Sequence, residues 1–157
     1  DKLDAGCTAL EEIRMIADAP GAPPPRQVSE IANYHAHIYY DAASRPRAER
    51  LRAGVAERFL VRIGNWHDEP VGPHPQAMFQ IAFAREVFSQ LVPWLMLNRL
   101  GLTVLVHPNT DNERADHLIH ALWMGQILPL DATDLSESLR AEGRSHAEIV
   151  PNTEPRG

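Results

Sequence analysis

Two histidines separated by one residue stand in the aromatic and apolar stretch 34–40. The alternation predicts a β-strand, and side chains along a strand point to opposite faces in turn. His35, His37 and Tyr39 should therefore share one face, while the other face suits a hydrophobic core. Because neutral imidazole is the commonest metal-ligand side chain, the two histidines are a candidate half of a metal site. A solvated polar face on a half-buried sheet is the alternative interpretation.

A third histidine is placed beside them by the order of the predicted elements. Strand, helix, strand, strand, helix, strand is the ferredoxin-like split βαβ pattern, an α+β fold whose antiparallel sheet carries its helices on one face. In this topology the first strand lies between the third and the fourth. Val104 and Val106 should face the helices, so His107 should face away from them. We therefore predict that His35, His37 and His107 converge and bind a divalent metal. A histidine-lined binding face without metal is the alternative.

Hydrophobic periodicity predicts where the elements lie. Helix 44–60 has apolar residues at core-facing spacing, and Pro93 should kink the second helix, 86–99, or delay its start. Pro108 should close the fourth strand, 102–107. The other predicted elements are strands over residues 61–66 and 77–83, a helix over 113–124 and a short edge strand over 127–131.

Three parts of the chain differ in composition. Residues 1–30 are predicted to be an N-terminal appendage, with a short helix over 8–18 and an extended proline-rich linker over 20–25. Residues 31–131 hold the ferredoxin-like domain. Residues 132–157 lose apolar periodicity, so they should form a tail that is mobile or wraps a partner.

Bulk properties exclude several classes of function. The 157 residues are 44% hydrophobic and 23% charged, which is typical of a soluble globular domain. A net charge of -6 argues against nucleic-acid and anionic-membrane surfaces, which require basic patches. The single cysteine, Cys7, excludes an internal disulfide framework and cysteine-rich zinc sites. No apolar run reaches the length of a membrane span, and the first residues lack the pattern of a signal peptide, so we expect a cytoplasmic protein.

The face that carries the predicted metal ligands also holds candidate substrate contacts. Arg62 and Trp66 of the second strand should lie on this face with Tyr39. Arg62 is suited to pairing with a substrate carboxylate. Because aromatic and apolar side chains on this face need cover, we predict a homodimer with facing sheets, a dimeric α+β barrel. Cover by the N-terminal segment or the C-terminal tail is the alternative.

Three other histidines are candidates for the site. His74 lies in a Gly-Pro-His-Pro loop and could be a metal ligand or a general acid/base. The predicted topology starts the third strand far from the metal ligands, so we favour an acid/base or substrate contact over ligation, while a solvent-exposed loop histidine is an equal alternative. His117 and His120 are three residues apart on a predicted helix. That spacing can form a metal pair, although a solvent-facing or backbone-bonded role is the favoured interpretation.

The pattern leaves the metal open. Non-haem iron oxygenases usually add a carboxylate to two histidines. None lies on the three inferred strand faces, although four acidic residues could reach in from the strand ends, namely Asp41, Asp68, Glu69 and Asp116.

Five blocks of the sequence resemble the DOPA 4,5-dioxygenase family. They are YHAHIY at 34–39, PVGPHP at 70–75, PWLMLNR at 93–99, GLTVLVHP at 101–108, and DH at 116–117 followed by WMG at 123–125. The resemblance covers about 34–131 and implies a ferredoxin-like fold, dimerisation, and extradiol ring-opening of a catechol such as DOPA with dioxygen at a non-haem iron. It implies Fe(II) as the cofactor, for which zinc could substitute. It also implies His35, His37 and His107 as ligands, with His74 near the chemistry.

Two other classes of function remain open on the residues alone. One is a zinc-dependent hydrolase or isomerase, because three imidazoles leave a position free for water or substrate. The other is a dimeric module that binds a small aromatic molecule or a metal without turnover.

Overall fold

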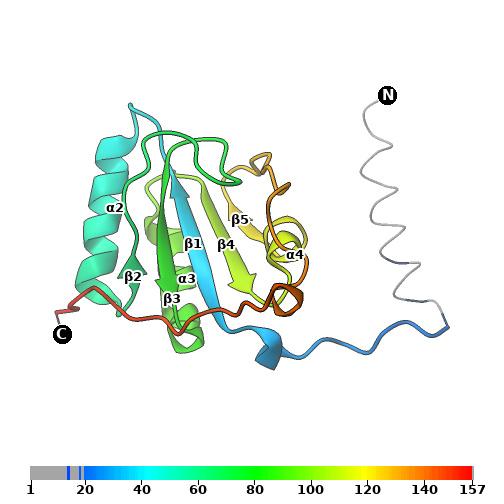
Figure 1. The fold of residues 1–157 in the computed structure, drawn as a ribbon. Helices are drawn as coiled ribbons and strands as arrows, with labels where there is room; N and C mark the ends of the chain where they lie inside the picture. The colour runs from blue at the N-terminus through cyan, green and yellow to red at the C-terminus, as the bar shows by residue number, and fades with distance from the viewer. Residues whose placement is uncertain (1–13, 15–17, 19, 157) are drawn as a thin grey trace.

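A computed structural model of the protein describes Arg14, Asp18 and residues 20–156. The predicted helix 8–18 lies outside the described residues except at those two positions. The described chain forms a sheet of five strands in the order β2-β3-β1-β4-β5, with every neighbouring pair antiparallel (Figure 1). The strands are β1 (Asn33–Tyr39), β2 (Arg62–Ile63), β3 (Met78–Phe83), β4 (Val104–Asn109) and β5 (Leu122–Met124).

Two longer helices and one short helix complete this α+β fold. They are α2 (Arg45–Arg58), α3 (Phe88–Asn98) and α4 (Glu113–Leu118), with 3-10 turns at Val28–Glu30, Arg85–Val87 and Arg140–Glu142. The order β1, α2, β2, β3, α3, β4 confirms the predicted ferredoxin-like pattern, with β1 central between β3 and β4. α3 begins at Phe88, as the alternative of a delayed start predicts, and Pro93 lies inside it.

Helices α2 and α3 cover one face of the sheet. Leu51 and Val55 of α2 and Leu91 and Leu95 of α3 are buried against this face in one hydrophobic cluster. Burying each such side chain contributes about 1.5–3 kcal/mol, so this layer holds the helices against the sheet. The strand residues of the cluster are the ones predicted to face the core, among them Ala36, Ile38, Val104 and Val106.

β4 extends past the residue that was expected to end it. Pro108 lies within β4, opposite Tyr34 of β1, so the prediction that Pro108 closes the strand is wrong. The Tyr39 N–H donates to the Thr103 carbonyl, which makes alternate pairs of the β1–β4 ladder the hydrogen-bonded ones. By this alternation the backbone nitrogen of Pro108 points away from β1. On that side Pro108 lies beyond Val106, the last residue of β4 that pairs with β5. Its missing N–H therefore costs the sheet no hydrogen bond.

The second predicted strand is shorter than expected, and this changes the position of Trp66. Val61 and Ile63 are buried in the core as predicted, but β2 ends at Ile63. The Trp66 ring packs against Phe79 with centroids 5.0 Å apart and lies under the Arg45 guanidinium. Trp66 is therefore on the helix side of the sheet, and the prediction that it faces with the histidines is wrong. Strand alternation no longer holds once the chain leaves the sheet.

The predicted helix 113–124 is also wrong in its second half. α4 ends at Leu118, which is 50% exposed, and Leu122–Met124 pair with β4 as the edge strand β5. Residues 127–131, predicted as the edge strand, form no strand. Pairing with the open edge of β4 gives the backbone groups of residues 122–124 long-range partners, and helical periodicity does not reveal such partners.

The face opposite α2 and α3 is partly covered by the chain itself. Tyr39, Met78 and Leu105 form a second cluster, which packs against residues of the segment 121–130. Residues 146–150 of the C-terminal tail lie over another part of the same face, beside His35 and Arg62, so the alternative of cover by the tail is confirmed in part. The homodimer remains a prediction, and this face of the sheet leaves less apolar surface for a second copy to bury than expected.

The C-terminal residues run back along the domain (Figure 1). The Asn152 N–H donates to the Val61 carbonyl over 2.9 Å, and the Asn152 side chain accepts from the Ile63 N–H over 2.7 Å. Thr153 bonds to the backbone at Phe59 and Val61. These residues take up backbone groups of β2 that the sheet leaves unpaired. None of the helices in the described part of the chain combines the length and apolar character that a bilayer crossing needs.

Candidate metal centre

Two central strands bring the three predicted metal-binding histidines together. His35 and His107 are direct partners in the β1–β4 register, and His37 lies two residues along β1. The Nε2 atoms of His37 and His107 are 3.1 Å apart. One ring nitrogen from each of the three residues lies within 4.8 Å of the others. The predicted convergence of these side chains is therefore present.

His74 also reaches the group, although its loop starts at the far end of β1. The loop closes on itself through an N–H to carbonyl bond from His74 to Val71, and Asp131 N–H bonds to the Pro73 carbonyl. The His74 ring lies 4.1 Å from the His37 ring, centroid to centroid, and is 5% exposed. Its Nδ1 is 2.6 Å from the Tyr39 hydroxyl. The solvent-exposed alternative for His74 is therefore wrong.

His117 is a fifth member of the group, which the sequence interpretation did not select. Its ring lies 3.9 Å from the His107 ring, centroid to centroid, and its ligand nitrogen lies within 4.8 Å of those of His37 and His74. His120, three residues later, instead contacts Arg26, with Nε2 3.0 Å from the guanidinium. His117 and His120 therefore do not form a pair: His120 lies beyond the end of α4, and the predicted backbone-bonded role is confirmed for His117, whose Nδ1 bonds to the Glu113 carbonyl.

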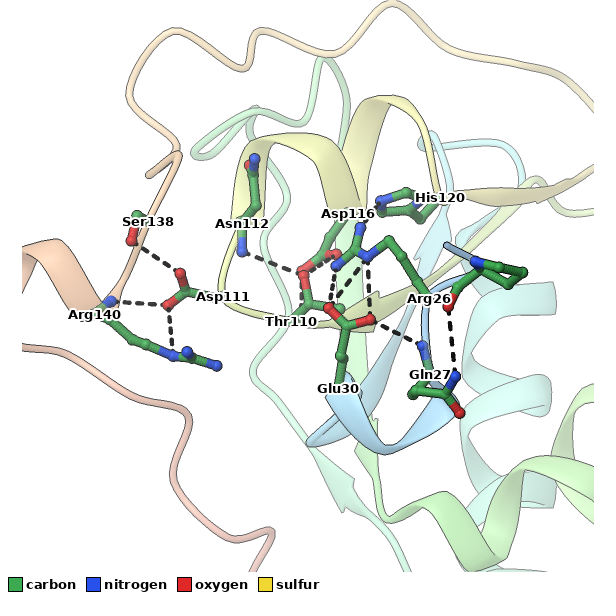
Figure 2. Close-up of polar contacts among 11 residues, drawn as sticks. Arg26, Gln27, Glu30, Thr110, Asp111, Asn112, Asp116, His120, Ser138 and Arg140 are labelled. Atoms are coloured by element: carbon green, nitrogen blue, oxygen red, sulfur yellow. Dashed lines mark hydrogen bonds and ion pairs between the residues drawn. The ribbon is translucent and has the colours of Figure 1, made fainter. Parts of the chain in front are cut away.

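A buried carboxylate, that of Asp116, holds α4, the helix that carries His117; its contacts to Thr110 are drawn in Figure 2. Thr110, which follows β4, donates to Asp116 from its N–H over 2.6 Å and from its hydroxyl over 2.8 Å. Asn112 caps the helix by accepting from the Ala115 N–H over 2.9 Å. Arg26 lies between Glu30 and His120, so the N-terminal segment also contacts the end of α4.

Burial keeps these imidazoles neutral. It lowers the pKa of His35 to about 3 and that of His74 to about 4, with repulsion from neighbouring imidazolium charge as the second cause. The same causes hold the pKa values of His37 and His107 well below the usual 6.5, and burial lowers that of His117. Neutral imidazoles present the lone pairs that a metal ion requires.

Hydrogen bonds at Nδ1 decide which nitrogen is free on two rings. His107 Nδ1 donates to the Pro108 carbonyl over 2.8 Å, and His117 Nδ1 donates to the Glu113 carbonyl over 2.7 Å. Because a carbonyl only accepts, the hydrogen of each neutral ring is on Nδ1 and Nε2 keeps its lone pair. Backbone anchoring of the distal nitrogen is the usual arrangement for metal-ligating histidines.

His35, His37 and His107 fit a divalent ion. Two nitrogens that each lie about 2.1 Å from one metal are about 3.0–3.4 Å apart, which matches the His37–His107 separation. His37 Nδ1 is buried with no hydrogen-bond partner among the described residues. A buried unpaired nitrogen costs about 1–3 kcal/mol, and a structure tolerates this where the group has another task.

The four acidic side chains that were considered as ligands are absent from both groups. Within residues 20–156 the possible metal-binding groups consist of histidines only. Asp68 pairs with Arg45 and accepts from the Tyr40 hydroxyl on the helix side. Asp116 is committed to Thr110, while Asp41 and Glu69 are exposed.

A cavity of about 490 Å³ lies beside His35. Arg62 lines it and shares the His35 face, because both residues pair with Ala82 of β3. The Arg62 guanidinium donates to the Val150 carbonyl over 3.3 Å. C-terminal residues including His146 and Glu148 form the outer wall. Sequence reasoning did not place this wall, because no periodicity marks a segment that binds through its backbone.

The sheet and its cluster of five imidazoles, three of them buried, define an α+β protein of the ferredoxin-like type with a histidine-rich candidate metal centre. Residues 34–134 match the model of the Dopa 4,5-dioxygenase family, and the chain belongs to this family. The resemblance seen in the sequence is confirmed. The matched range contains all five histidines, whereas His146 and the cavity wall lie beyond it.

Relatives and a solved structure agree with this assignment. The chain is 38% identical to an "Uncharacterized 21.2 kDa protein" of Botryotinia fuckeliana over 128 residues, 72% of this chain and 68% of that protein. It is 34% identical to a DOPA 4,5-dioxygenase of Amanita muscaria over 116 residues, 68% of this chain, and spans 51% of the length of that enzyme. The crystal structure of a "putative dioxygenase" from Nostoc punctiforme is 51% identical, with a TM-score of 0.67 over 68% of this chain and 92% of that one. These names support an oxygenase enzyme.

Proposed function

We propose that the protein is a non-haem-iron extradiol dioxygenase that opens the ring of a catechol such as DOPA. The observation that carries the proposal is the convergence of His35, His37 and His107 beside a cavity in a chain of this family. In the reaction a ring carbon–carbon bond next to the two hydroxyls breaks, and both atoms of dioxygen enter the product. The atoms balance without an external reductant.

His35, His37 and His107 are the residues that would hold the iron. A ferrous ion bound there would supply open coordination positions for the catechol oxygens and dioxygen. The two strands position the three imidazoles before substrate arrives, because His37 and His107 are almost fully buried in the sheet. His35 is partly exposed and lies at the cavity, so substrate approaches from its side.

His74 is the proposed acid/base residue. A catechol must lose a hydroxyl proton to bind as an anion, and a neutral imidazole can accept that proton and return it later. The Tyr39 hydroxyl lies at His74 Nδ1; in the proposed role Nδ1 carries the ring hydrogen and donates it to the Tyr39 oxygen, which leaves the Nε2 lone pair to accept the substrate proton. We assign Tyr39 the task of orienting His74. Tyr39 is 1% exposed, so it meets substrate at most through its hydroxyl.

Arg62 is the proposed contact for a charged ring substituent. It lies in the wall of the cavity and has one carbonyl partner, Val150, which a substrate carboxylate can replace. We expect Arg62→Gln to raise KM for DOPA by about tenfold or more, since a charge-assisted hydrogen bond contributes about 1.5–3 kcal/mol. With 4-methylcatechol, which has no carboxylate, the KM should stay within about twofold. Equal losses for both substrates would contradict this role. Trp66, on the helix side, has no part in the proposed site.

The test of the function is anaerobic loading with Fe(II), followed by DOPA and simpler catechols in air. We expect oxygen uptake that requires both iron and a catechol, with a yellow ring-opened product. The zinc-loaded protein is the control and should show no uptake. No uptake across the panel, from folded and iron-loaded protein, would overturn the proposal.

A zinc-dependent hydrolase or isomerase is the second candidate. It is favoured by one observation, the absence of a carboxylate from both histidine groups within residues 20–156. Iron oxygenases usually have one, whereas three histidines are a known catalytic zinc set. Zinc-dependent turnover of an ester or a small carbonyl compound, without oxygen uptake, would favour this candidate.

We also propose that the protein is a homodimer. Ile119 and Ile127 are 74% and 79% exposed, which leaves apolar surface near α4 and β5 for a second copy. Sedimentation equilibrium should give twice the chain mass of 17.6 kDa. A single species of that chain mass would contradict it.

A further inference from the structure

One row of side chains crosses the histidine face of the sheet, from the metal centre to the cavity wall. His35 pairs with His107 on one side and with Ala82 on the other, and Ala82 in turn pairs with Arg62. Neighbouring strands are about 4.8 Å apart, so the backbone of Arg62 lies about 10 Å from that of His35. A catechol ring with a side chain of two or three carbons spans a similar distance.

Ala82 forms the floor of the cavity between the two ends of this row. Its side chain is a single methyl group, which is buried and lines the cavity of about 490 Å³. A larger side chain at this position would fill the space above the sheet. The row therefore leaves room for an aromatic ring between His35 and Arg62.

Glu148 adds a negative charge to the wall of the same cavity. It is exposed and has no hydrogen-bond or ion-pair partner for its carboxylate within residues 20–156. Arg62 bonds only to the Val150 carbonyl there, and no ion pair joins Arg62 to Glu148. Two opposite charges that share a cavity without neutralising each other are complementary to the two charges of a zwitterion.

The backbone around Glu148 is held on both sides. The Asn33 side chain, which is 5% exposed, donates to the Ala147 carbonyl over 3.1 Å. Two residues after Glu148, the Val150 carbonyl accepts from Arg62. The wall that carries the carboxylate is therefore formed before a ligand arrives, which lowers the entropy cost of binding.

We propose that Glu148 binds the ammonium group of an α-amino-acid catechol and makes the cavity selective for a zwitterionic side chain. In this arrangement the catechol oxygens point toward the metal centre at His35, the ring lies over Ala82, and the carboxylate meets Arg62. The role of Glu148 rests on the proposed function, because the metal centre positions the ring. Glu148 lies outside residues 34–134, the range that the family model matches.

Four catechols that differ in the charge of their side chain test this subsite. DOPA carries both charges, dihydrocaffeate lacks the ammonium group, dopamine lacks the carboxylate, and 4-methylcatechol lacks both. Anaerobic calorimetry on the zinc-loaded protein, which is redox-inert, gives a Kd for each. Glu148→Gln should raise the Kd about fivefold for DOPA and dopamine, the upper range for an exposed charge pair. The Kd of the other two should stay within about twofold.

Reversal of the charge gives a result that a structural role of Glu148 would not produce. Glu148→Lys should raise the Kd for dopamine at least tenfold and lower the Kd for dihydrocaffeate, because the new ammonium group repels one and attracts the other. The control is Glu154→Gln, an exposed glutamate of the same tail that does not line this cavity, and it should leave all four values unchanged. Equal effects of Glu148→Gln on all four ligands, no effect on any, or no binding of any ligand by the folded wild type would overturn the subsite.

Oxygen uptake by the iron-loaded enzyme separates this inference from the proposed function. Glu148→Gln should lower kcat/KM about fivefold for DOPA and leave it within about twofold for 4-methylcatechol. An iron-loaded wild type without uptake for any catechol would refute the proposed function, and the anaerobic Kd values would still decide whether Glu148 reads the ammonium group.

Discussion

The Nε2 atoms of His37 and His107 lie 3.1 Å apart, although 70 positions separate these residues in the chain. The antiparallel β1–β4 register places them diagonally on adjacent central strands, where both side chains are almost fully buried. Neither ring can turn into solvent without displacing the residues that bury it. The pair is therefore preorganised for a metal ion, which lowers the entropy cost of binding it.

Removal of the shared histidine should abolish metal binding. We expect His37→Ala to weaken Co(II) binding at least 100-fold and to reduce iron-dependent oxygen uptake to background, because both histidine groups lose a donor. Calorimetry on the metal-free protein measures the affinity. His67→Ala is the control, since His67 belongs to neither group. A folded His37→Ala protein that keeps its metal and activity would refute the assignment.

The contact between Tyr39 and His74 should matter for rate and not for metal. Tyr39→Phe removes the hydroxyl that lies 2.6 Å from His74 Nδ1. General acid/base catalysis contributes about 10²–10⁴-fold, so a poorly oriented His74 should lower kcat by about tenfold. The metal content should stay unchanged, and measurement of both quantities separates orientation from ligation. An unaltered kcat would show that the hydroxyl has no part in positioning His74.

The metal-free protein should lose stability as the pH falls below 6.5. Burial lowers the folded-state pKa of His35 to about 3 and of His74 to about 4, whereas both groups have ordinary values near 6.5 when unfolded. Between these values the unfolded chain binds protons that the folded chain does not, which favours unfolding. Each such histidine contributes about 1.4 kcal/mol per pH unit to the slope.

Urea titrations at intervals from pH 7.5 to 5 measure this slope. His74→Gln should reduce the slope by about 1.4 kcal/mol per pH unit, which corresponds to one proton. The control is His67→Ala, because His67 lies outside the histidine cluster. A free energy of unfolding that is constant from pH 7 to pH 5 would contradict the buried neutral state.

The carboxylate of Asp116 should stabilise the domain by holding α4 against β4. It is fully buried and accepts two hydrogen bonds from Thr110. Asp116→Asn replaces one acceptor oxygen by a donor, so we expect a loss of about 1–3 kcal/mol in the free energy of unfolding. Asp134→Asn, at an exposed position, should change it by less than about 0.5 kcal/mol. Similar values for both variants would mean that Asp116 does not anchor the helix.

Local pattern was sufficient for the central strands and the order of the elements. Alternation put Ala36 and Ile38 in the core and His37 on the opposite face, because a strand that is buried on both faces still keeps a strict period of two. Once β1 and β4 were recognised as antiparallel neighbours, the approach of His107 to His35 followed from topology. Pattern failed at Trp66 and at residues 119–124, where a short strand ended early and an edge strand replaced a helix.

The sequence by itself determined the fold class, the family and the three strand histidines, because these depend on periodicities and residue blocks that neighbouring residues carry. Only the tertiary structure decided that His74 and His117 join them, that Trp66 does not, and that residues 146–150 wall the cavity. Those outcomes depend on how loops and short elements satisfy buried backbone and carboxylate groups, as Asp116 does for Thr110 and Asn152 for β2. Such contacts join residues far apart in the chain, so no local spacing records them.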